Sequence, residues 1–482
     1  MNESSGAFFD PASFDRLTGG DAAFLDVESE LTRMAVAACL VFEAAPSRLE
    51  DGRLDLDGIR ARVARRLEEM PRYRQRLATS PLERRPIWVA DEHFDLDRHI
   101  RHHVLSTGRL AELRSFCADQ AASAFDRDHP LWQLWVIENL EDDRFAILIK
   151  AHHCMVDGIA GIELLRSMLD VEAGPLEDRI HHHRRRRTPS RIELAWLEAI
   201  ERAKANARLV RDSFGALREP GELIREAGDL GRGLWYAQRY ELHAASDTPL
   251  NHPASGDRSC AWLDLEISRI DEIRKAKGGT LNDVVVATLS LALDRLLEAR
   301  GIPRRELLEM DLRVTCPVNT RSRGHRSEAA NQIALLVVPL PTGESDPLVV
   351  LDRVRESLAE AKDSHMVEVL EAILRLADWL PRRFARGLVH YALKVRSANL
   401  VVTNIPGPRG PLHLGRSRLL AAYPIVPLMP GHALCVAVLS QAGTLHWGLN
   451  ADRQAVRDLA DWPGAIEEAF ERLHAAATGS GD

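Results

Sequence analysis

The chain has 482 residues, of which 45% are hydrophobic and 28% are charged, a balance typical of globular proteins that bury a core. Its length fits about three ordinary domains or two larger ones. The formal net charge of -8 argues against a nucleic-acid-binding protein, because such proteins carry an excess of basic residues that neutralise phosphates.

The cysteines and the apolar runs exclude further classes of protein. The six cysteines are scattered and form no CxxC pair, so we expect no metal site and no disulfide framework. Residues 1–5 lack the basic-then-apolar order of a signal peptide, which favours a cytoplasmic location. No apolar run approaches the roughly 20 residues that span a bilayer. Any membrane contact is therefore expected to be peripheral.

The first half of the chain predicts a sheet. Residues 34–42 (MAVAACLVF) form a short apolar run, which indicates a buried strand. Residues 131–140 and 145–150 are separated by Glu141-Asp142-Asp143, and this pattern predicts a β-hairpin. Because residues 145–149 are all apolar, we expect their strand to lie inside the sheet with both faces covered.

The predicted hairpin leads directly into two consecutive histidines, His152 and His153. After Gly158, the residues Ile162, Leu165 and Leu169 recur at helical spacing. The predicted order is therefore a strand, a short loop that carries the histidines, and a helix.

The composition changes near residue 175. Residues 175–189 contain three histidines and four arginines in a row without apolar periodicity, which indicates an exposed, charged linker. The alternative for this run is binding to anionic lipid or to CoA phosphates. Residues 190–242 are helix-like with a break at Pro220-Gly221, and a second lobe is expected from Pro249 onward.

The second lobe mixes predicted helices and strands. A long helix starts at Leu281, with apolar residues along one stripe. Residues 312–318 and 333–340 are strand-like, residues 434–449 indicate a hairpin, and a helix closes the chain. The predicted fold class is therefore α/β (α+β).

His152 and His153 are the candidate catalytic residues. Adjacent residues at the end of a strand point in opposite directions, so only one of the two histidines is expected to face a cleft. A histidine with an ordinary pKa of about 6.5 is largely neutral at cytoplasmic pH and suits a general base. A single histidine beside a strand is usually a core residue, but two histidines with Asp157 and Gly158 at a strand-to-helix junction favour catalysis. We expect Asp157 to orient the loop rather than to react.

The segment from His152 to Gly158 resembles the HHxxxDG motif of the CoA-dependent acyltransferase superfamily. Further segments are similar to motifs of its bacterial wax ester synthase/diacylglycerol acyltransferase family, in the expected order from about residue 15 to 460. These segments are residues 17–25, Pro130-Leu131-Trp132, Asn282-Asp283, Asn331 with Leu340-Pro341, and Asn404-Ile405-Pro406-Gly407. The DFGWG signature of the chloramphenicol and plant-type branches is absent from the sequence. The chain departs from the common pattern at Ala330, Ile405 and Gln441.

For the other motif residues, a structural role has to be weighed against a functional one. Thr280 followed by Asp283 before an apolar helix predicts an N-terminal cap, whereas Asn282 could instead help to hold an oxyanion, a role for which Gly158 is also a candidate. Trp132 is expected to pack in a strand, together with Pro130 and Leu131. By composition, Asn404, Pro406 and Gly407 predict a turn.

The resemblance implies two chloramphenicol-acetyltransferase-like lobes with mixed sheets flanked by helices. Residues 1–180 would form the first lobe, residues 181–245 a charged and helical connector, and residues 246–482 the second lobe. His153 would take the proton from a fatty alcohol or diacylglycerol hydroxyl, whose oxygen attacks the thioester of acyl-CoA in a tunnel between the lobes. Acyl-CoA is then a donor substrate, and no bound cofactor is implied.

Three alternatives stay open at this point. The chain could use a carrier-protein donor, as condensation enzymes do, it could bind lipid without turnover, or its histidines could be purely structural. A nucleophilic role of Cys154 is not expected, because direct activation of the acceptor needs no acyl-enzyme. The family also makes a peripheral contact with a membrane or lipid-droplet surface an expectation, whereas the sequence indicates no oligomeric state.

Overall fold

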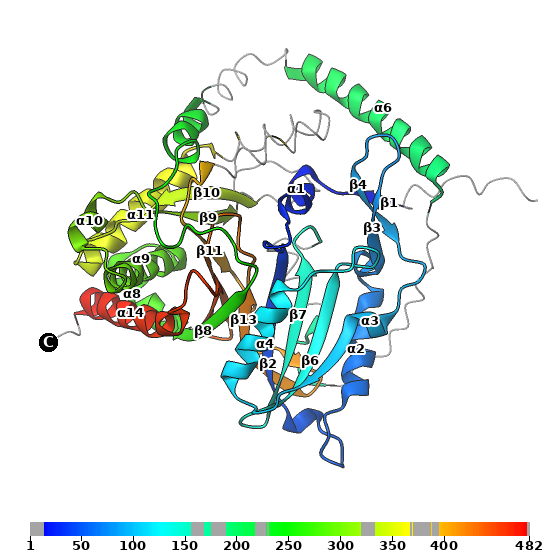
Figure 1. The fold of residues 1–482 in the computed structure, drawn as a ribbon, viewed down its shortest axis with the longest axis horizontal. Helices are drawn as coiled ribbons and strands as arrows, with labels where there is room; N and C mark the ends of the chain where they lie inside the picture. Colours follow the sequence, from blue (N-terminus) through cyan, green and yellow to red (C-terminus); the bar gives the residue numbers. More distant parts are fainter. Residues whose placement is uncertain are drawn as a thin grey trace, which may run out of the picture.

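The computed structural model describes residues 14–155, 168–174, 189–216, 231–319, 333–366 and 395–479, together with residues 228, 369 and 387. Within these residues, two six-stranded sheets form two lobes, each with helices against its sheet (Figure 1). This arrangement confirms the predicted α/β class with two sheet-bearing lobes. None of the described helices is long and apolar enough to cross a membrane.

The first sheet carries the predicted hairpin. Its strands, in spatial order, are β12 (His413–Leu414), β13 (Ser417–Ile425), β2 (Ala35–Glu43), β7 (Arg144–His152), β6 (Trp132–Leu140) and β5 (Ile100–Val104). β7 pairs antiparallel with β2 on one side and with β6 on the other. The predicted strand near residues 34–42, the hairpin and the interior position of its second strand are thus all confirmed.

The two faces of the first sheet are covered by different helices. On one face, Leu40 and Phe42 of β2 share a core with α2 (Leu56–Glu68). On the other face, Cys39 and Val41 share a core with α4 (Leu110–Ala122). The alternation follows from the two-residue repeat of side chains along a strand, and it explains why most residues of β2 and all but the first residue of β7 are buried.

The second sheet has the order β10 (Ile333–Pro339), β9 (Arg313–Asn319), β11 (Leu400–Ile405), β14 (Leu434–Gln441), β15 (Thr444–Asp452) and β8 (Arg258–Glu266). β11 runs parallel to both of its neighbours, whereas the other pairs are antiparallel. The helices of this lobe are α8 (Ile267–Lys277), α9 (Leu281–Ala299), α10 (Arg304–Glu309), α11 (Pro347–Asp363) and α14 (Trp462–Thr478). The predicted long helix, strands, hairpin and closing helix are therefore present.

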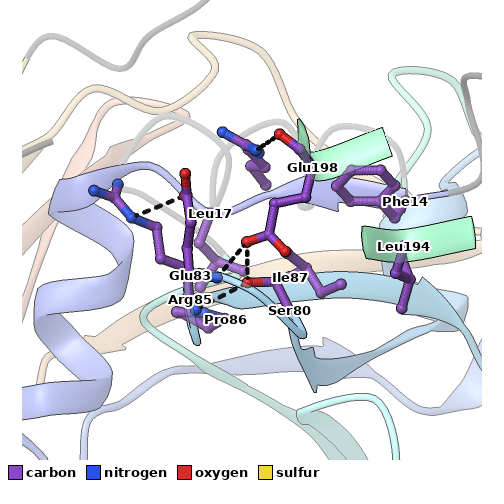
Figure 2. Close-up of a pocket in the computed structure, with 10 residues that line it drawn as sticks. Phe14, Leu17, Ser80, Glu83, Arg85, Pro86, Ile87, Leu194 and Glu198 are labelled. Atoms are coloured by element: carbon purple, nitrogen blue, oxygen red, sulfur yellow. Dashed lines mark hydrogen bonds and ion pairs between the residues drawn. The ribbon is translucent and has the colours of Figure 1, made fainter. Parts of the chain in front are cut away.

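A small third sheet lies at the edge of the first lobe and holds the connector helix. Its strands are β1 (Phe14–Arg16), β4 (Pro86–Ala90) and β3 (Gln75–Thr79), and the helix is α6 (Arg191–Ala216). The buried carboxylate of Glu198 on α6 accepts hydrogen bonds from Ser80 Oγ at 2.7 Å and from two backbone amides of the β3–β4 turn (Figure 2). The cavity beside it measures about 30 Å³. That volume holds about two water molecules and is too small for a lipid chain.

Two strands from the C-terminal half of the chain complete the first sheet. β13 pairs with β2, for example Tyr423 with Cys39, although its residues belong by sequence to the segment 246–482. Without this pairing, β2 would present an unpaired edge. The predicted boundaries at residues 180 and 245 do not account for this pairing, in which a strand from the segment 246–482 joins the sheet of the first lobe. Hydrogen bonding to the edge of β2, rather than position in the sequence, decides where β13 lies.

Candidate active site

The candidate active site begins where β7 ends. His152 is the last residue of β7, and its backbone N–H donates to the carbonyl of Leu131 at 2.8 Å, on the β6 side. The next backbone N–H, that of His153, donates to the carbonyl of Met34 at 2.8 Å, on the β2 side. The two histidines are therefore fixed to different neighbouring strands, and their side chains enter different surroundings.

The His152 side chain is buried, at 1% exposure. Its Nδ1 accepts a hydrogen bond from the backbone N–H of Cys154 at 3.1 Å, and its Nε2 lies 3.6 Å from Oε2 of Glu28. An accepting Nδ1 in a neutral imidazole leaves the proton on Nε2, where it faces the carboxylate. The contacts of His152 are thus those of a structural histidine that organises the loop.

Glu28 is a member of the site that the sequence did not reveal. Its side chain is only 7% exposed and pairs with Arg127 as well as His152. Burial raises the pKa of Glu28, but His152 and Arg127, which both face the carboxylate, outweigh burial and hold the pKa at about 2. The carboxylate is therefore ionised at neutral pH. The sequence feature that could have pointed to Glu28 is its position three residues after the segment 17–25, the first segment that resembles a motif of the family.

His153 has the properties of a neutral base. The residue is half-buried, and its ring stacks on Phe24, with ring centroids 3.7 Å apart and an interplanar angle of 14°. Burial lowers the pKa of His153 to about 4, against the opposing effect of its own backbone carbonyl. No neighbouring residue in the described part of the chain bonds to its buried Nδ1. The imidazole is therefore uncharged at neutral pH, as a general base must be.

Helix α1 (Gly19–Val27) brings Phe24 and Glu28 to the two histidines. Thr18 caps the helix by accepting from the backbone N–H of Asp21 at 3.1 Å, and Glu28 is the residue that ends it. Residues four apart on a helix lie on the same face, so one face of α1 contacts His153 through Phe24 and His152 through Glu28. None of the residues of α1 is fully buried, so the helix covers the histidines as a half-exposed layer.

Cys154 does not have the properties of a nucleophile. It is buried, and burial raises the pKa of its thiol far above the ordinary value. Since the thiolate is the reactive form of cysteine, the thiol of Cys154 is inert. This finding agrees with the expectation that the chain forms no acyl-enzyme at this residue.

The Pro130-Leu131-Trp132 motif supports the histidine loop from the β6 side. All three residues are buried. Leu131 accepts the backbone N–H of His152, and Nε1 of Trp132 donates to the carbonyl of Tyr73 at 2.8 Å. The predicted packing role is confirmed, and the motif also fixes the backbone of His152.

The Asn282-Asp283 motif caps α9. Asp283 accepts from the backbone N–H of Thr280 at 2.6 Å, and Thr280 Oγ1 accepts from the backbone N–H of Asp283 at 3.3 Å. The predicted cap is therefore confirmed. Within the described residues, no hydrogen bond joins Asn282 to His153, and an oxyanion role of Asn282 stays a prediction. Asp157, Gly158 and Asn331 lie outside the described residues.

The turn predicted for residues 404–407 is wrong for its first half. Asn404 and Ile405 are the last residues of β11, because both pair with the adjacent strand β14. The chain leaves the strand only at Pro406. Gly407 is required where it stands, since a Cβ atom there would lie 2.0 Å from the carbonyl oxygen of Ser440. In the part of the chain that the structure describes, no group of three or more His, Cys, Asp or Glu side chains could hold a metal ion.

Comparison with known proteins identifies the family. Residues 17–285 match the wax ester synthase/diacylglycerol acyltransferase catalytic domain, and residues 329–474 match the WS/DGAT C-terminal domain. The chain is 31% identical to a probable diacylglycerol O-acyltransferase of Mycobacterium tuberculosis, over 95% of this chain and 96% of that protein. It is 29% identical to O-acyltransferase WSD of Acinetobacter baylyi, over 80% and 82% of the two chains. The chain belongs to the wax ester synthase/diacylglycerol acyltransferase family.

Solved structures agree on the fold. The wax ester synthase/diacylglycerol acyltransferase of Marinobacter aquaeolei is similar with a TM-score of 0.65 and 24% identity, over 96% of this chain and 99% of that chain. The first condensation domain of the CDA synthetase is similar with a TM-score of 0.57 and 15% identity, over 97% of each chain. The predicted family, fold and enzyme class, an acyltransferase, are thus confirmed, whereas the roles of individual residues stay predictions.

Proposed function

We propose that the chain transfers a fatty acyl group from acyl-CoA to the hydroxyl of a lipid alcohol, either diacylglycerol or a long-chain fatty alcohol, with His153 as the general base. The observation that carries this proposal is the neutral imidazole of the half-buried residue His153, directly after the end of β7, with its pKa lowered to about 4. Family membership supplies the reaction class. Together they support a base that activates the acceptor directly.

In the proposed reaction, His153 takes the proton from the acceptor hydroxyl through Nε2, because its Nδ1 is buried. The oxygen then attacks the carbonyl carbon of the thioester and forms a tetrahedral oxyanion. Collapse of this intermediate breaks the C–S bond, and the departing sulfur takes the proton from the imidazolium of His153. The products are an ester and the free thiol of CoA, and His153 is neutral again. Asn282 and Gly158 are the candidates for holding the oxyanion.

The test is thiol release from palmitoyl-CoA in the presence of hexadecanol, of diacylglycerol, or of neither. We expect release that depends on an acceptor and that falls by about 10²- to 10⁴-fold in His153→Ala, the usual contribution of general base catalysis. The effective acceptor names the substrate class. Near-normal release by a folded His153→Ala protein would contradict the role of His153. Release from a loaded carrier protein, but not from acyl-CoA, would instead identify a condensation-type donor.

We infer that α6 carries the contact with a lipid surface. Ile192 and Trp196 lie four residues apart on one face of this helix, and they are 84% and 57% exposed. Leu194 and Leu197, on the other face, are buried. Arg191 is exposed beside the apolar pair. An exposed tryptophan with a basic residue beside it is a feature of helices that lie in the interface of an anionic bilayer, so an anionic lipid surface is the partner that this face fits.

A further inference from the structure

We propose that Glu28 is a positioning residue of the active site, which holds the backbone and the ring orientation of the His152-His153 junction from α1. This inference rests on the proposed role of His153 as the base. It assigns a function in catalysis to a carboxylate that does not itself reach the reacting atoms.

The carboxylate of Glu28 makes contacts toward both histidines. Oε2 faces Nε2 of His152 at 3.6 Å and pairs with Arg127. Oε1 accepts from the backbone N–H of Met34 at 3.4 Å. Met34, in turn, accepts the backbone N–H of His153 through its carbonyl at 2.8 Å. One carboxylate therefore reaches the ring of the first histidine and, through the backbone of the single residue Met34, the backbone of the second.

Two basic side chains, Arg127 and Lys150, lie near the Glu28–His152 pair. Arg127 faces it from the loop between α4 and β6, and Lys150 lies on the same face of β7 as His152, two residues earlier. Nζ of Lys150 donates to the carbonyl and to Oγ of Ser123, both at 2.7 Å, and lies 4.3 Å from the ring centroid of Phe125. Phe125 also contacts His152 edge-on, at 6.1 Å between ring centroids. Glu28 thus supplies the negative charge that Arg127 and the Nε2–H of His152 face.

Removal of the Glu28 carboxylate would deprive His152 and Arg127 of the group that they face. Nε2 of His152 would lose the carboxylate that it faces in a buried place, where an unpaired polar group is costly, and the exposed guanidinium of Arg127 would lose its ion-pair partner. The loop can relieve that cost by turning His152 away. Because His153 is the adjacent residue, such a rotation also moves the base relative to the acceptor hydroxyl. Misplacement of a base lowers turnover more than it lowers substrate binding.

The experiment compares Glu28→Ala, Glu28→Gln and the control Glu30→Gln, which changes an exposed carboxylate two residues further along. We expect Glu28→Ala to lower kcat about 10- to 100-fold, the loss seen when groups that orient histidine ligands are removed from metal sites. The KM values for acyl-CoA and for the acceptor should change less than about threefold. Glu28→Gln keeps an acceptor oxygen for His152 and should recover part of kcat, while Glu30→Gln should match the unmodified enzyme.

A double-mutant cycle tests whether Glu28 acts through His152. If it does, removing Glu28 from a His152→Gln protein should change kcat far less than removing it from the unmodified enzyme. Glutamine keeps a donor near the position of Nε2, so this variant guards against a misfolded His152→Ala protein. Additive losses would overturn the proposal. A folded Glu28→Ala protein with unchanged kcat would overturn it as well.

Three further outcomes distinguish a positioning role of Glu28 from a purely structural role and from the role of His153 as the base. A loss of kcat in Glu28→Ala that disappears on cooling, together with a lowered Tm, would show that Glu28 only stabilises the fold, and this result would also overturn the proposal. If His153→Ala keeps its turnover, the proposed function fails whatever Glu28 does. If His153→Ala is inactive while Glu28→Ala is normal, only the role of Glu28 fails.

Discussion

At the scale of single residues, His152 and His153 are neighbours with opposite surroundings. His152 is enclosed between the backbone N–H of Cys154 and the carboxylate of Glu28, so both of its ring nitrogens are directed at polar groups. His153 has an aromatic ring, Phe24, as its main neighbour. An apolar neighbour withdraws water without offering a counter-charge, and for this reason the imidazolium of His153 is disfavoured.

The lowered pKa of His153 predicts the pH dependence of the reaction. Burial disfavours the charged form, so the ring stays neutral, and competent as a base, as the pH falls until about 4. We therefore expect the acid limb of kcat/KM to fall at about pH 4, not near the ordinary histidine value of about 6.5. The measurement is kcat/KM for acyl-CoA between pH 3.5 and 8, with enzyme stability checked at each pH. A limb near 6.5 would mean that the ring is solvated in the working enzyme.

At the scale of elements, local sequence specifies those helices and strands of the site whose residues are contiguous in the chain. The β6–β7 hairpin follows from two apolar runs with an acidic turn between them, and the cap of α9 follows from Thr280 and Asp283 three residues apart. The placement of α1 over the histidines has no local signal, because α1 precedes them by more than a hundred residues. Only side-chain contacts in the folded chain, such as Phe24 on His153, define it.

Helix α6 provides a prediction at this scale. We expect the protein to co-sediment with vesicles that contain anionic lipid, and we expect Trp196→Ala to lower its partition coefficient about 10- to 100-fold, because burial of a large apolar side chain stabilises binding by roughly 1.5–3 kcal/mol. Leu308→Ala is the matched control, since Leu308 is 60% exposed on α10 in the other lobe. Equal binding by both variants, or equal losses, would contradict a lipid-binding role of α6.

At the scale of the whole molecule, the two lobes are joined by β13. Tyr423 on this strand stacks on Trp262 of β8, with ring centroids 4.4 Å apart, and its hydroxyl donates to Asp264 at 3.1 Å. The backbone of β13 crosses β15 so closely that a Cβ atom at Gly448 would lie 1.8 Å from the carbonyl oxygen of Pro424. The contact between the lobes therefore depends on a position without a side chain.

Substitution of Gly448 tests this contact. Gly448→Ala must push β13 and β15 apart, and overpacking of this kind costs about 1–3 kcal/mol. We expect a lower Tm and a loss of turnover, while Gly464→Ala, a helical position with open space around it, should leave stability unchanged or raise it by about 0.5–1 kcal/mol. Thermal unfolding and thiol release of both variants provide the measurement. An unchanged Tm in Gly448→Ala would show that the lobes can separate freely at this strand.

The sequence by itself determined the fold class, the family, the hairpin that ends in the two histidines, and the capped helix α9, because each depends on periodicity or motifs within a short stretch of chain. The tertiary structure decided which histidine is buried, which residue carries the nearby carboxylate, and that β13 completes the first sheet. These features arise from contacts between segments far apart in the chain. Glu28 and His152 are separated by more than a hundred residues, and only burial of both side chains in one place gives the pair its electrostatic effect.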